Sequence, residues 1–258
     1  MRRFWLACIF LFATFLIKAQ SADSLFKQGN YQDAILAYEF EYYQSGQDSS
    51  LLKKSWAYKA MGKYDQAILN LKRINDFDTS YELALLYYLN DQLALSNASL
   101  LRMGMSGSDT TFNATLLKAM VQVDQLQIEE AKNHLIKHSD LLGLDDAAIS
   151  SIFPKKIKIK NPDRAYNISL FAPGFGQAYA GYPGRGFVSG AMQLGTVGFT
   201  YWSLINRYYF SGVLTGAALF YTFYLGGARY AGILANERNE KLTEEIKNQI
   251  SEQIKKPE

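Results

Sequence analysis

The stretch at residues 171–187, FAPGFGQAYAGYPGRGF, combines five glycines and two prolines with a single charge, Arg185. Glycine-rich runs of this kind can wrap around phosphate groups, so nucleotide binding is the first chemistry to consider. A P-loop continues with Gly-Lys-Ser/Thr, but here GRGF follows and supplies no hydroxyl for a magnesium ion. A dinucleotide site needs a later acidic residue that binds the ribose, and no Asp or Glu occurs between this stretch and Glu237. We therefore expect no nucleotide loop, and predict instead that Pro173 and Gly174 break a short interfacial helix and that the loop after them re-enters a packed helical hairpin.

The histidines His134 and His138 are four residues apart, a spacing that places both on one side of a helix and can bind a metal. No glutamate stands between them in the HExxH manner, and the sequence shows no third ligand. Asp145 and Asp146 fit charges at a helix N-terminus better than an acid–base pair. We therefore expect no metal site, no cofactor and no catalysis.

The N-terminal segment, MRRFWLACIFLFATFLIKAQS, has the features of a secretory signal peptide. Arg2 and Arg3 precede an apolar run at residues 4–17, and Ala19 precedes a polar segment, so we expect a signal peptide at 1–19. An uncleaved signal anchor is the alternative. Cys8, the only cysteine, lies inside the apolar run, so the mature chain can form no disulfide.

Charge divides the mature chain unevenly. Residues 21–150 carry 11 basic and 17 acidic residues, whereas residues 151–164 carry five basic residues and one acidic residue. Residues 165–236 contain three arginines and no carboxylate. A nucleic-acid-binding protein would need a basic face over its folded part, so we expect no nucleic-acid partner. The carboxylate-free region, rich in glycine and aromatic residues, is not typical of a soluble domain.

An internal repeat occupies the first half of the chain. GNYQDAI at 29–35 matches GKYDQAI at 62–68, and LALSNAS at 93–99 and LQIEEAK at 126–132 continue the series more weakly. A period near 34 residues predicts stacked helix pairs. In our alignment a small residue recurs in each unit with a large apolar residue three positions before it: Ala34 after Tyr31, Ala67 after Tyr64, Ala98 after Leu95, and Ala131 after Ile128.

This pattern resembles the tetratricopeptide family, with about four helix pairs in a domain at 20–150. The resemblance implies that the first helix of each unit lines a groove that binds a protein or peptide. The positions that it places on the groove are Asp23, Phe26, Lys27, Trp56, Lys59, Tyr87, Asn90, Met120 and Val123. The partner-binding residues would then be Phe26, Lys27, Trp56, Lys59, Tyr87 and Asn90. The open alternative is that Trp56 and Tyr87 pack between neighbouring units.

Two apolar runs follow the glycine-rich stretch. Residues 186–206 and 209–228 contain no charge, and each is long enough to cross a hydrocarbon core as a helix. Because only two residues separate them, we expect a tight antiparallel transmembrane hairpin. Small residues four apart would let its helices touch, and we expect this role for Gly186, Gly190, Gly195, Gly212 and Gly216. The alternatives are a buried hairpin in a soluble domain and an oligomerisation face with no other role.

The glycine-rich stretch resembles the signature Pro-Gly-x-Gly-Gln-x-Tyr-x-Gly of a family of small two-span membrane domains. Those domains are sometimes attached to tetratricopeptide repeats in bacterial envelope proteins and have no established chemistry. The matching residues are Pro173, Gly174, Gly176, Gln177, Tyr179 and Gly181. The resemblance implies a membrane hairpin domain at 165–236. Arg185 either meets lipid phosphate at its edge or simply flanks the first span.

Two flanking segments complete the expected organisation. The basic linker at 151–164 either lies on an anionic membrane surface or forms a solvated stalk. The tail at 237–258 predicts an amphipathic helix that is solvated or paired with another chain. With two spans this tail lies on the same side as the repeats, whereas a third crossing at 165–182 would place it in the cytoplasm.

The sequence therefore predicts an all-α protein with a helical-repeat solenoid, a two-helix transmembrane hairpin and a C-terminal amphipathic helix. We expect it in the bacterial cell envelope, on the periplasmic side of the inner membrane, anchored in the lipid bilayer. The favoured function is binding of an envelope protein or peptide by the repeats. The alternative is a structural subunit of a membrane complex, including a homo-oligomer, in which the hairpin makes the main contacts.

Overall fold

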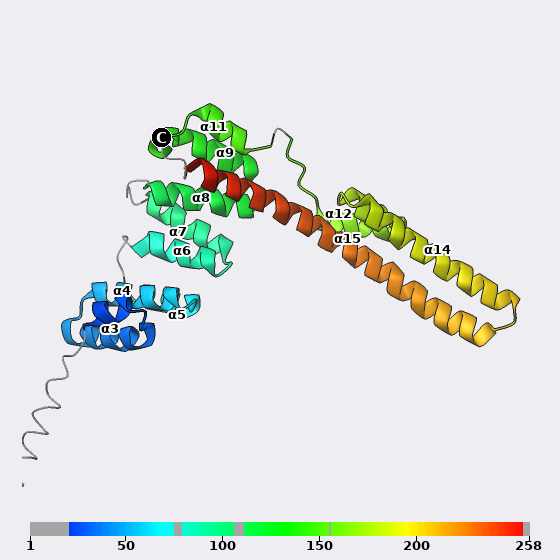
Figure 1. The fold of residues 1–258 in the computed structure, drawn as a ribbon, viewed down its shortest axis with the longest axis horizontal. Coiled ribbons are helices and arrows are strands. Elements are labelled where there is room, and N and C mark those ends of the chain that lie inside the picture. Colours follow the sequence, from blue (N-terminus) through cyan, green and yellow to red (C-terminus); the bar gives the residue numbers. More distant parts are fainter. Residues whose placement is uncertain (1–20, 75–78, 106–110, 155, 255–258) are drawn as a thin grey trace, which may run out of the picture. The chain divides into compact units, whose positions relative to one another are not determined.

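The computed structural model describes residues 21–74, 79–105, 111–154 and 156–254 (Figure 1). Every regular element in these ranges is a helix, and consecutive helices pack against one another in pairs. The prediction of an all-α protein with paired helices is thereby confirmed. The expected signal peptide at 1–19 lies outside the described residues.

The chain divides into two compact units, with the boundary between Val121 and Gln122. The boundary falls inside helix α8 (Phe112–Asp124) and therefore within the range 20–150 that the sequence predicts as one repeat domain. We describe the two units separately.

The first unit is a series of helix pairs. Its helices before α8 are α2 (Ala22–Lys27), α3 (Tyr31–Ser45), α4 (Asp48–Ala60), α5 (Tyr64–Leu71), α6 (Ser80–Leu89) and α7 (Leu93–Met105). Helices α2 and α3, α4 and α5, and α6 and α7 pack as pairs, and α3 with α4 and α5 with α6 join one pair to the next. Ala34 and Ala67 are fully buried at these packing positions, as the small-residue pattern requires.

The turn within each helix pair has one recurring geometry. A residue with positive φ follows the first helix at Gly29, Gly62, Asp91 and Leu126, with φ of 80°, 69°, 61° and 61°. In each turn the next amide N–H donates to the carbonyl five residues earlier, which is the Schellman pattern of a helix end. These bonds run from Asn30 to Leu25, Lys63 to Tyr58, Gln92 to Tyr87, and Gln127 to Gln122. The turns therefore mark four equivalent repeats.

The structure corrects the sequence alignment of the third repeat. Counted from Asp91, the small residue equivalent to Ala34 is Ser96 and not Ala98. Ser96 is fully buried, and its hydroxyl donates to the carbonyl of Ala84 at 2.8 Å, whereas Ala98 is exposed. A serine hydroxyl fits a close helix crossing when a backbone carbonyl accepts its hydrogen bond. The spacing of the repeats is thus 33, 29 and 35 residues between the positive-φ positions.

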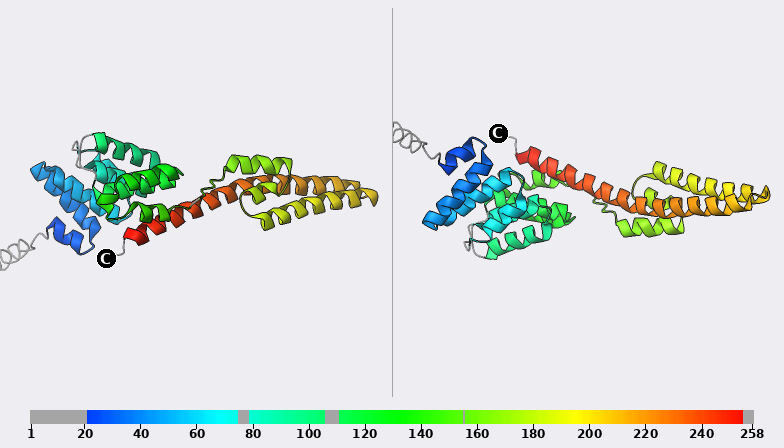
Figure 2. Two further views of the ribbon diagram at one scale, coloured as in Figure 1. Left: turned by 90° about the horizontal axis from the view of Figure 1, so that it is seen from above. Right: turned by 90° about the horizontal axis from the view of Figure 1, so that it is seen from below.

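The second unit begins with short helices and ends in a long hairpin. Its helices are α9 (Ile128–Lys137), α10 (Ser139–Leu142), α11 (Asp146–Ile152), α12 (Pro162–Phe171), α13 (Phe175–Tyr179), α14 (Pro183–Ile205) and α15 (Tyr209–Ile254). Figures 1 and 2 show α14 and α15 side by side, joined by a tight turn at Arg207, whose φ is 66°. Helices α12 and α13 pack against α15 near the open end of this hairpin.

Helix α15 is continuous over 46 residues. The sequence predicts a hairpin arm that ends near residue 236 and a separate tail helix, but no proline interrupts the chain there, and the helix runs through Gly226 and Gly227. The stripe of apolar residues expected in the tail is used within the chain. Ile246 and Ile250 are fully buried, α15 packs against α11, and Lys247 forms a 2.7 Å ion pair with Asp124 of α8.

The expected transmembrane spans at 186–206 and 209–228 are not supported. Among the residues that the structure describes, no helix combines the length and the apolar character of a membrane span. Both runs form helices, but glycine, threonine and tyrosine are interspersed with their apolar residues, and α14 also carries Gln193. The absence of charged residues in the two runs does not reveal that these small and polar residues lower their average hydropathy. Residues 165–182 form parts of two short helices and not one long crossing helix.

Candidate functional site

The side chain of Gln177 joins the four helices at the open end of the hairpin. It is fully buried on α13. Its Oε1 accepts a hydrogen bond from Ser169 of α12 at 3.1 Å, and its Nε2 donates to Ser189 of α14 at 3.2 Å and to the carbonyl of Gly227 of α15 at 2.9 Å. A buried amide is stabilising only when its polar groups are paired, as they are here. Gln177 therefore holds the local fold together.

The signature glycines let backbones approach one another. Gly174 has φ of 94°, a conformation that side chains disfavour, and it lies directly against Gly186 of α14. A methyl group at either residue would overlap the carbonyl of the other, and one at Gly176 would overlap the carbonyl of Ala165. Gly181 has φ of 99° in the turn before α14. These glycines therefore serve packing and turning.

The remaining signature residues also have structural positions. Pro173 follows the end of α12, and its carbonyl lies 3.3 Å from the position that a Cβ would occupy at Gly190. The hydroxyl of Tyr179 accepts a hydrogen bond from the amide of Asn161 at 3.3 Å, so this tyrosine holds the linker at the start of α12.

The hairpin is polar inside and apolar outside. The buried residues of α14 are Gly186, Gln193, Thr196 and Ser203, all of them small or polar. On α15, Gly212 packs against Ser203, and Gly216 packs against Thr200. The hydroxyls of Thr196 and Thr200 donate to carbonyls of their own helix.

The outer surface of the hairpin, over residues 187–205 of α14 and 210–221 of α15, is almost entirely apolar and aromatic. Its exposed large side chains are Phe187, Val188, Met192, Leu194, Val197, Phe199, Tyr201, Trp202, Leu204, Ile205, Phe210, Val213, Leu214, Leu219, Phe220 and Tyr221. We call this surface the apolar belt. An exposed apolar surface of this extent marks a place where something other than water covers the protein.

Arginine and aromatic residues bound the apolar belt at both ends. At the open end, Arg185 donates to the hydroxyl of Tyr230 at 2.9 Å, lies 4.9 Å from the Tyr182 ring and lies 3.6 Å from Glu237. At the closed end, Trp202 and Tyr208 stack with ring centroids 6.2 Å apart beside Arg207. The 20 helical steps from Arg185 to Ile205, the last residue of α14, correspond to about 30 Å, close to the thickness of a hydrocarbon core.

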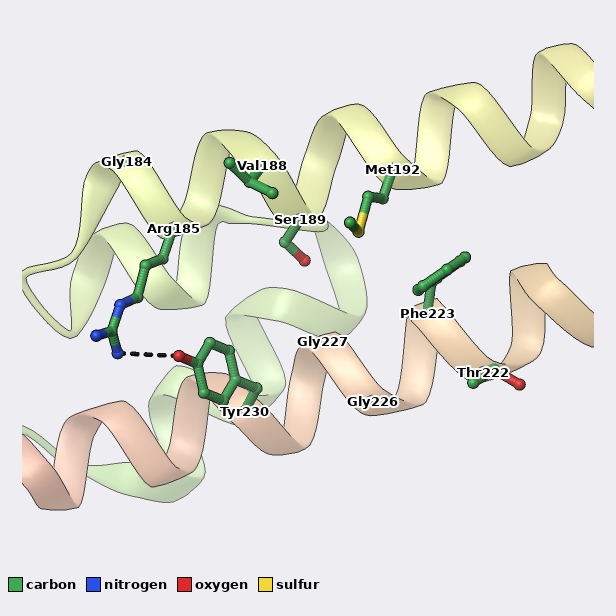
Figure 3. A pocket seen from close by; sticks show the side chains of 10 residues that line it. All are labelled: Gly184, Arg185, Val188, Ser189, Met192, Thr222, Phe223, Gly226, Gly227 and Tyr230. Carbon is green, nitrogen blue, oxygen red and sulfur yellow. Dashed lines mark hydrogen bonds between the residues drawn. The ribbon is translucent and has the colours of Figure 1, made fainter.

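A groove opens between α14 and α15 beside Arg185 (Figure 3). Its volume is about 570 Å³. Val188, Met192 and Phe223 line it, and Gly226 and Gly227 present no side chain on the α15 side. The Arg185–Tyr230 hydrogen bond closes one end. The groove is thus open and mostly apolar, with the Arg185 cation at one end. Its lining residues do not place a nucleophile next to a base.

The predicted partner-binding residues of the first unit fall into two groups. Three are engaged within the chain. Tyr87 is 6 % exposed and belongs to a hydrophobic cluster, Lys59 pairs with Glu82 at 2.8 Å, and Asn90 donates to Asp65 at 2.9 Å. For Tyr87 this arrangement matches the packing alternative.

The other three predicted partner-binding residues retain some exposure. Phe26 is half-buried, with its ring edge-on to Tyr31 at 5.4 Å, Lys27 is exposed, and Trp56 is half-buried. Counted from the positive-φ residue of each turn, Phe26, Lys59 and Val123 are equivalent. By the same count the third repeat places Tyr88 and Leu85 at the groove positions. The sequence alignment missed both, because it was shifted by two residues in this repeat.

Comparison of the chain with models of protein families, with curated proteins and with solved structures gave no match. The functional argument therefore rests on the geometry described above.

Proposed function

We propose that this protein is a membrane-anchored envelope protein whose helical repeats bind a protein or peptide, and that it is not an enzyme. The observation that carries the proposal is the inverted arrangement of the hairpin, with polar residues inside, the apolar belt outside, and arginine and aromatic residues at both ends. In water such a surface would be strongly unfavourable, whereas lipid chains would cover it.

The polar interior of the hairpin accounts for the modest average hydropathy of its two helices. Average hydropathy counts every residue, including the polar ones between the two helices, but lipid would contact only the outer surface. Gln193, Thr196 and Ser203 are at most 5 % exposed and would not meet lipid. Close packing of small and polar residues with apolar residues outward is typical of helix pairs in membranes.

Contacts within the second unit favour two crossings and not three. The linker residue Lys160 exchanges two 2.8 Å hydrogen bonds with the side chain of Asn239 on α15. The segments that enter and leave the hairpin therefore lie at its same end. If the leader directs export, the linker and the end of α15 both lie on the periplasmic side of the inner membrane.

The most direct test of anchoring is flotation of the chain without its expected leader, residues 20–258, with phosphatidylcholine vesicles. Val197 is 51 % exposed near the middle of the apolar belt. We expect Val197→Lys to abolish flotation, because a lysine at mid-membrane depth is unfavourable by about 3 kcal/mol. The matched change Leu36→Lys, at a 70 % exposed site in the first unit, should float normally. Equal flotation of both variants would argue against the anchor.

The proposed interaction role of the repeats is tested by crosslinking in native membranes. We expect the double change Phe26→Ala and Lys27→Glu to abolish the crosslinks of the first unit. The control is Leu36→Ala with Lys63→Glu, which makes comparable changes at exposed positions outside the predicted groove. Tyr87→Ala is unsuitable as a test because it would open the hydrophobic core. Retention of crosslinks in the Phe26 variant would exclude the predicted groove.

The alternative function, a subunit whose hairpin assembles with other chains, is favoured by one observation. Gly195 and Gly198 on α14 have no atom within 4 Å of the position that a Cβ would occupy, so another helix could approach there. Gly212 and Gly216 are already covered by α14, and substituting them would damage the hairpin itself. Gly195→Leu is therefore the informative change: loss of a larger native complex with normal flotation would favour this alternative.

A further inference from the structure

A cleft of about 390 Å³ lies at the open end of the hairpin, between the linker and α15. Its charged lining residues are Lys156, Lys158, Lys160, Arg238, Lys241 and Glu245. Five cations thus share one cleft with a single carboxylate. Like charges at this density repel one another, so the arrangement favours an anion between them.

Specific contacts hold the two walls of the cleft together. The two hydrogen bonds between the Lys160 backbone and the Asn239 side chain fix the linker to α15. The Lys160 ammonium lies 4.8 Å from the centre of the Tyr179 ring, within the range of a cation–π contact. Lys241 donates to Glu237 at 2.7 Å and to the Tyr182 hydroxyl at 3.2 Å. The site is therefore organised before any ligand arrives.

The intramolecular partners do not neutralise the cleft. Of the cleft cations, Glu237 offsets only Lys241, whose hydrogen bond is the main cause that lowers the pKa of Glu237. Within the described part of the chain, Lys156, Lys158 and Arg238 form no ion pair with a carboxylate. Three cations are left for a ligand with several negatively charged oxygens. Phosphate has this chemistry, and the planar guanidinium of Arg238 can bind two of its oxygens at once.

We propose that this cleft binds the phosphate of an anionic phospholipid headgroup. The inference rests on the proposed membrane anchoring, because that function places the open end of the hairpin at the lipid headgroups. Gly181, which lines the cleft, lies four residues before Arg185 at the edge of the apolar belt. A lipid whose chains lie along the belt would thus have its headgroup beside the cleft. Free phosphate has the same chemistry and is the other source to be tested.

Native mass spectrometry of the full chain in a nonionic detergent tests the site. The probes are dihexanoyl phosphatidylglycerol, dihexanoyl phosphatidylcholine and inorganic phosphate. We expect one tightly bound phosphatidylglycerol, much weaker phosphatidylcholine, and no inorganic phosphate at the same concentration. In the double variant Lys158→Gln and Arg238→Gln, phosphatidylglycerol should bind about tenfold more weakly or worse, as expected from loss of charge-assisted hydrogen bonds. The control Lys132→Gln with Lys137→Gln removes the same charge from α9 and should bind normally.

The outcomes separate this inference from the anchor itself. Flotation with neutral phosphatidylcholine vesicles reports the anchor and should not change in the Lys158 and Arg238 variant. If flotation is normal but the two lipids bind equally, or the cleft and control variants weaken binding equally, the cleft proposal is wrong and the anchor stands. Inorganic phosphate binding as tightly as phosphatidylglycerol would overturn the lipid assignment. If the wild-type chain fails to float, the proposed function fails, and the headgroup assignment fails with it.

Discussion

At the residue scale, buried polar groups determine which side chains of the hairpin are structural. Gln177 and Gln193 are both buried amides on neighbouring helices, but their environments differ. Gln177 bonds to three helices, whereas the Oε1 of Gln193 has no hydrogen-bond partner among the described residues. Removing a satisfied amide leaves its partners unpaired, whereas replacing an unsatisfied one with an apolar group of similar size removes a penalty.

This contrast predicts opposite effects of the same substitution. Gln177→Leu should lower the stability of the hairpin by about 2 kcal/mol or more, because the Ser169 hydroxyl and the Gly227 carbonyl lose their partner. Gln193→Leu should be neutral or stabilising. Thermal unfolding of the full chain in detergent, followed by circular dichroism, checks both. Equal destabilisation by the two changes would contradict the structural role given to Gln177.

A second residue-scale prediction concerns acid stability. The pKa of Asp23 is lowered from its usual 3.8, first by the hydrogen bond from Lys53 at 2.9 Å and then by that from Tyr38 at 2.7 Å. A carboxyl whose folded pKa is lowered stabilises the fold above its unfolded pKa, and this stabilisation is lost as the pH falls below about 3.8 through the lowered value. The melting temperature should therefore fall below pH 4, and less steeply in Asp23→Asn. An unchanged slope in that variant would exclude this contribution.

At the element scale, the repeats show what sequence patterns reveal and what they miss. The glycines at 29 and 62 make the first two turns recognisable, because glycine readily adopts positive φ. Asp91 and Leu126 occupy the same conformation without that signal, so the third repeat was aligned two residues too late. The error carried over to Tyr87 and Asn90, which are engaged within the chain. Asparagine and aspartate adopt positive φ more readily than most residues, so Asp91 itself could have indicated the turn.

Leu126 provides a test of this turn geometry. A leucine with φ of 61° is strained, so Leu126→Gly should raise stability by about 1 kcal/mol. Gly62→Ala, at φ of 69°, should lower it by a similar amount. Both are measured by chemical denaturation of the full chain in detergent. A loss of stability in Leu126→Gly would contradict the assigned conformation.

The hairpin elements were predicted more successfully than their ends and inner contacts. The two uncharged runs do form a tight antiparallel hairpin. Of the glycines predicted to pack its helices together, Gly212 and Gly216 contact the other helix, whereas Gly186 and Gly190 contact the Pro173–Gly174 segment. Gly195 makes no close contact, because the inner face of α14 follows Gln193, Thr196 and Ser203. That face could have been found from the seven- and three-residue spacing of its polar residues. The continuity of α15 could not, since Gly226 and Gly227 weaken a helix without requiring it to end.

A pair of glycine substitutions tests the helix packing. Gly174→Ala should strongly destabilise the hairpin, because the added methyl group would overlap Gly186 and favour a different φ. Gly195→Ala should be neutral or stabilise α14 by about 0.5–1 kcal/mol, because the site is open. Protease resistance of the full chain in detergent separates the two. Equal behaviour would show that Gly174 is not at a close crossing.

At the scale of the whole molecule, the two units serve different purposes in our account. The first unit presents a helical-repeat surface with four ion pairs among its described residues, and the hairpin of the second unit carries the apolar belt. Sequence composition predicted the region without carboxylates, because they stop before residue 165 and resume at Glu237, but it did not predict the boundary between the two units at Val121 and Gln122. It did not predict that Lys160 and Asn239 would fasten the linker to the long helix, because that contact depends on where the chain returns.

The measurement that tests the central claim most directly is the surroundings of Val197 in reconstituted phosphatidylcholine vesicles. The chain's only cysteine is Cys8, so in a Cys8→Ser background Val197→Cys can carry a single spin label. We predict that the label collides more with oxygen, which dissolves in the bilayer, than with a water-soluble nickel complex. A label at Leu36→Cys in the first unit should show the reverse. If the Val197 label instead collides mainly with the nickel complex, as a label at Leu36 does, the hairpin does not lie in the bilayer and the proposed anchor is wrong.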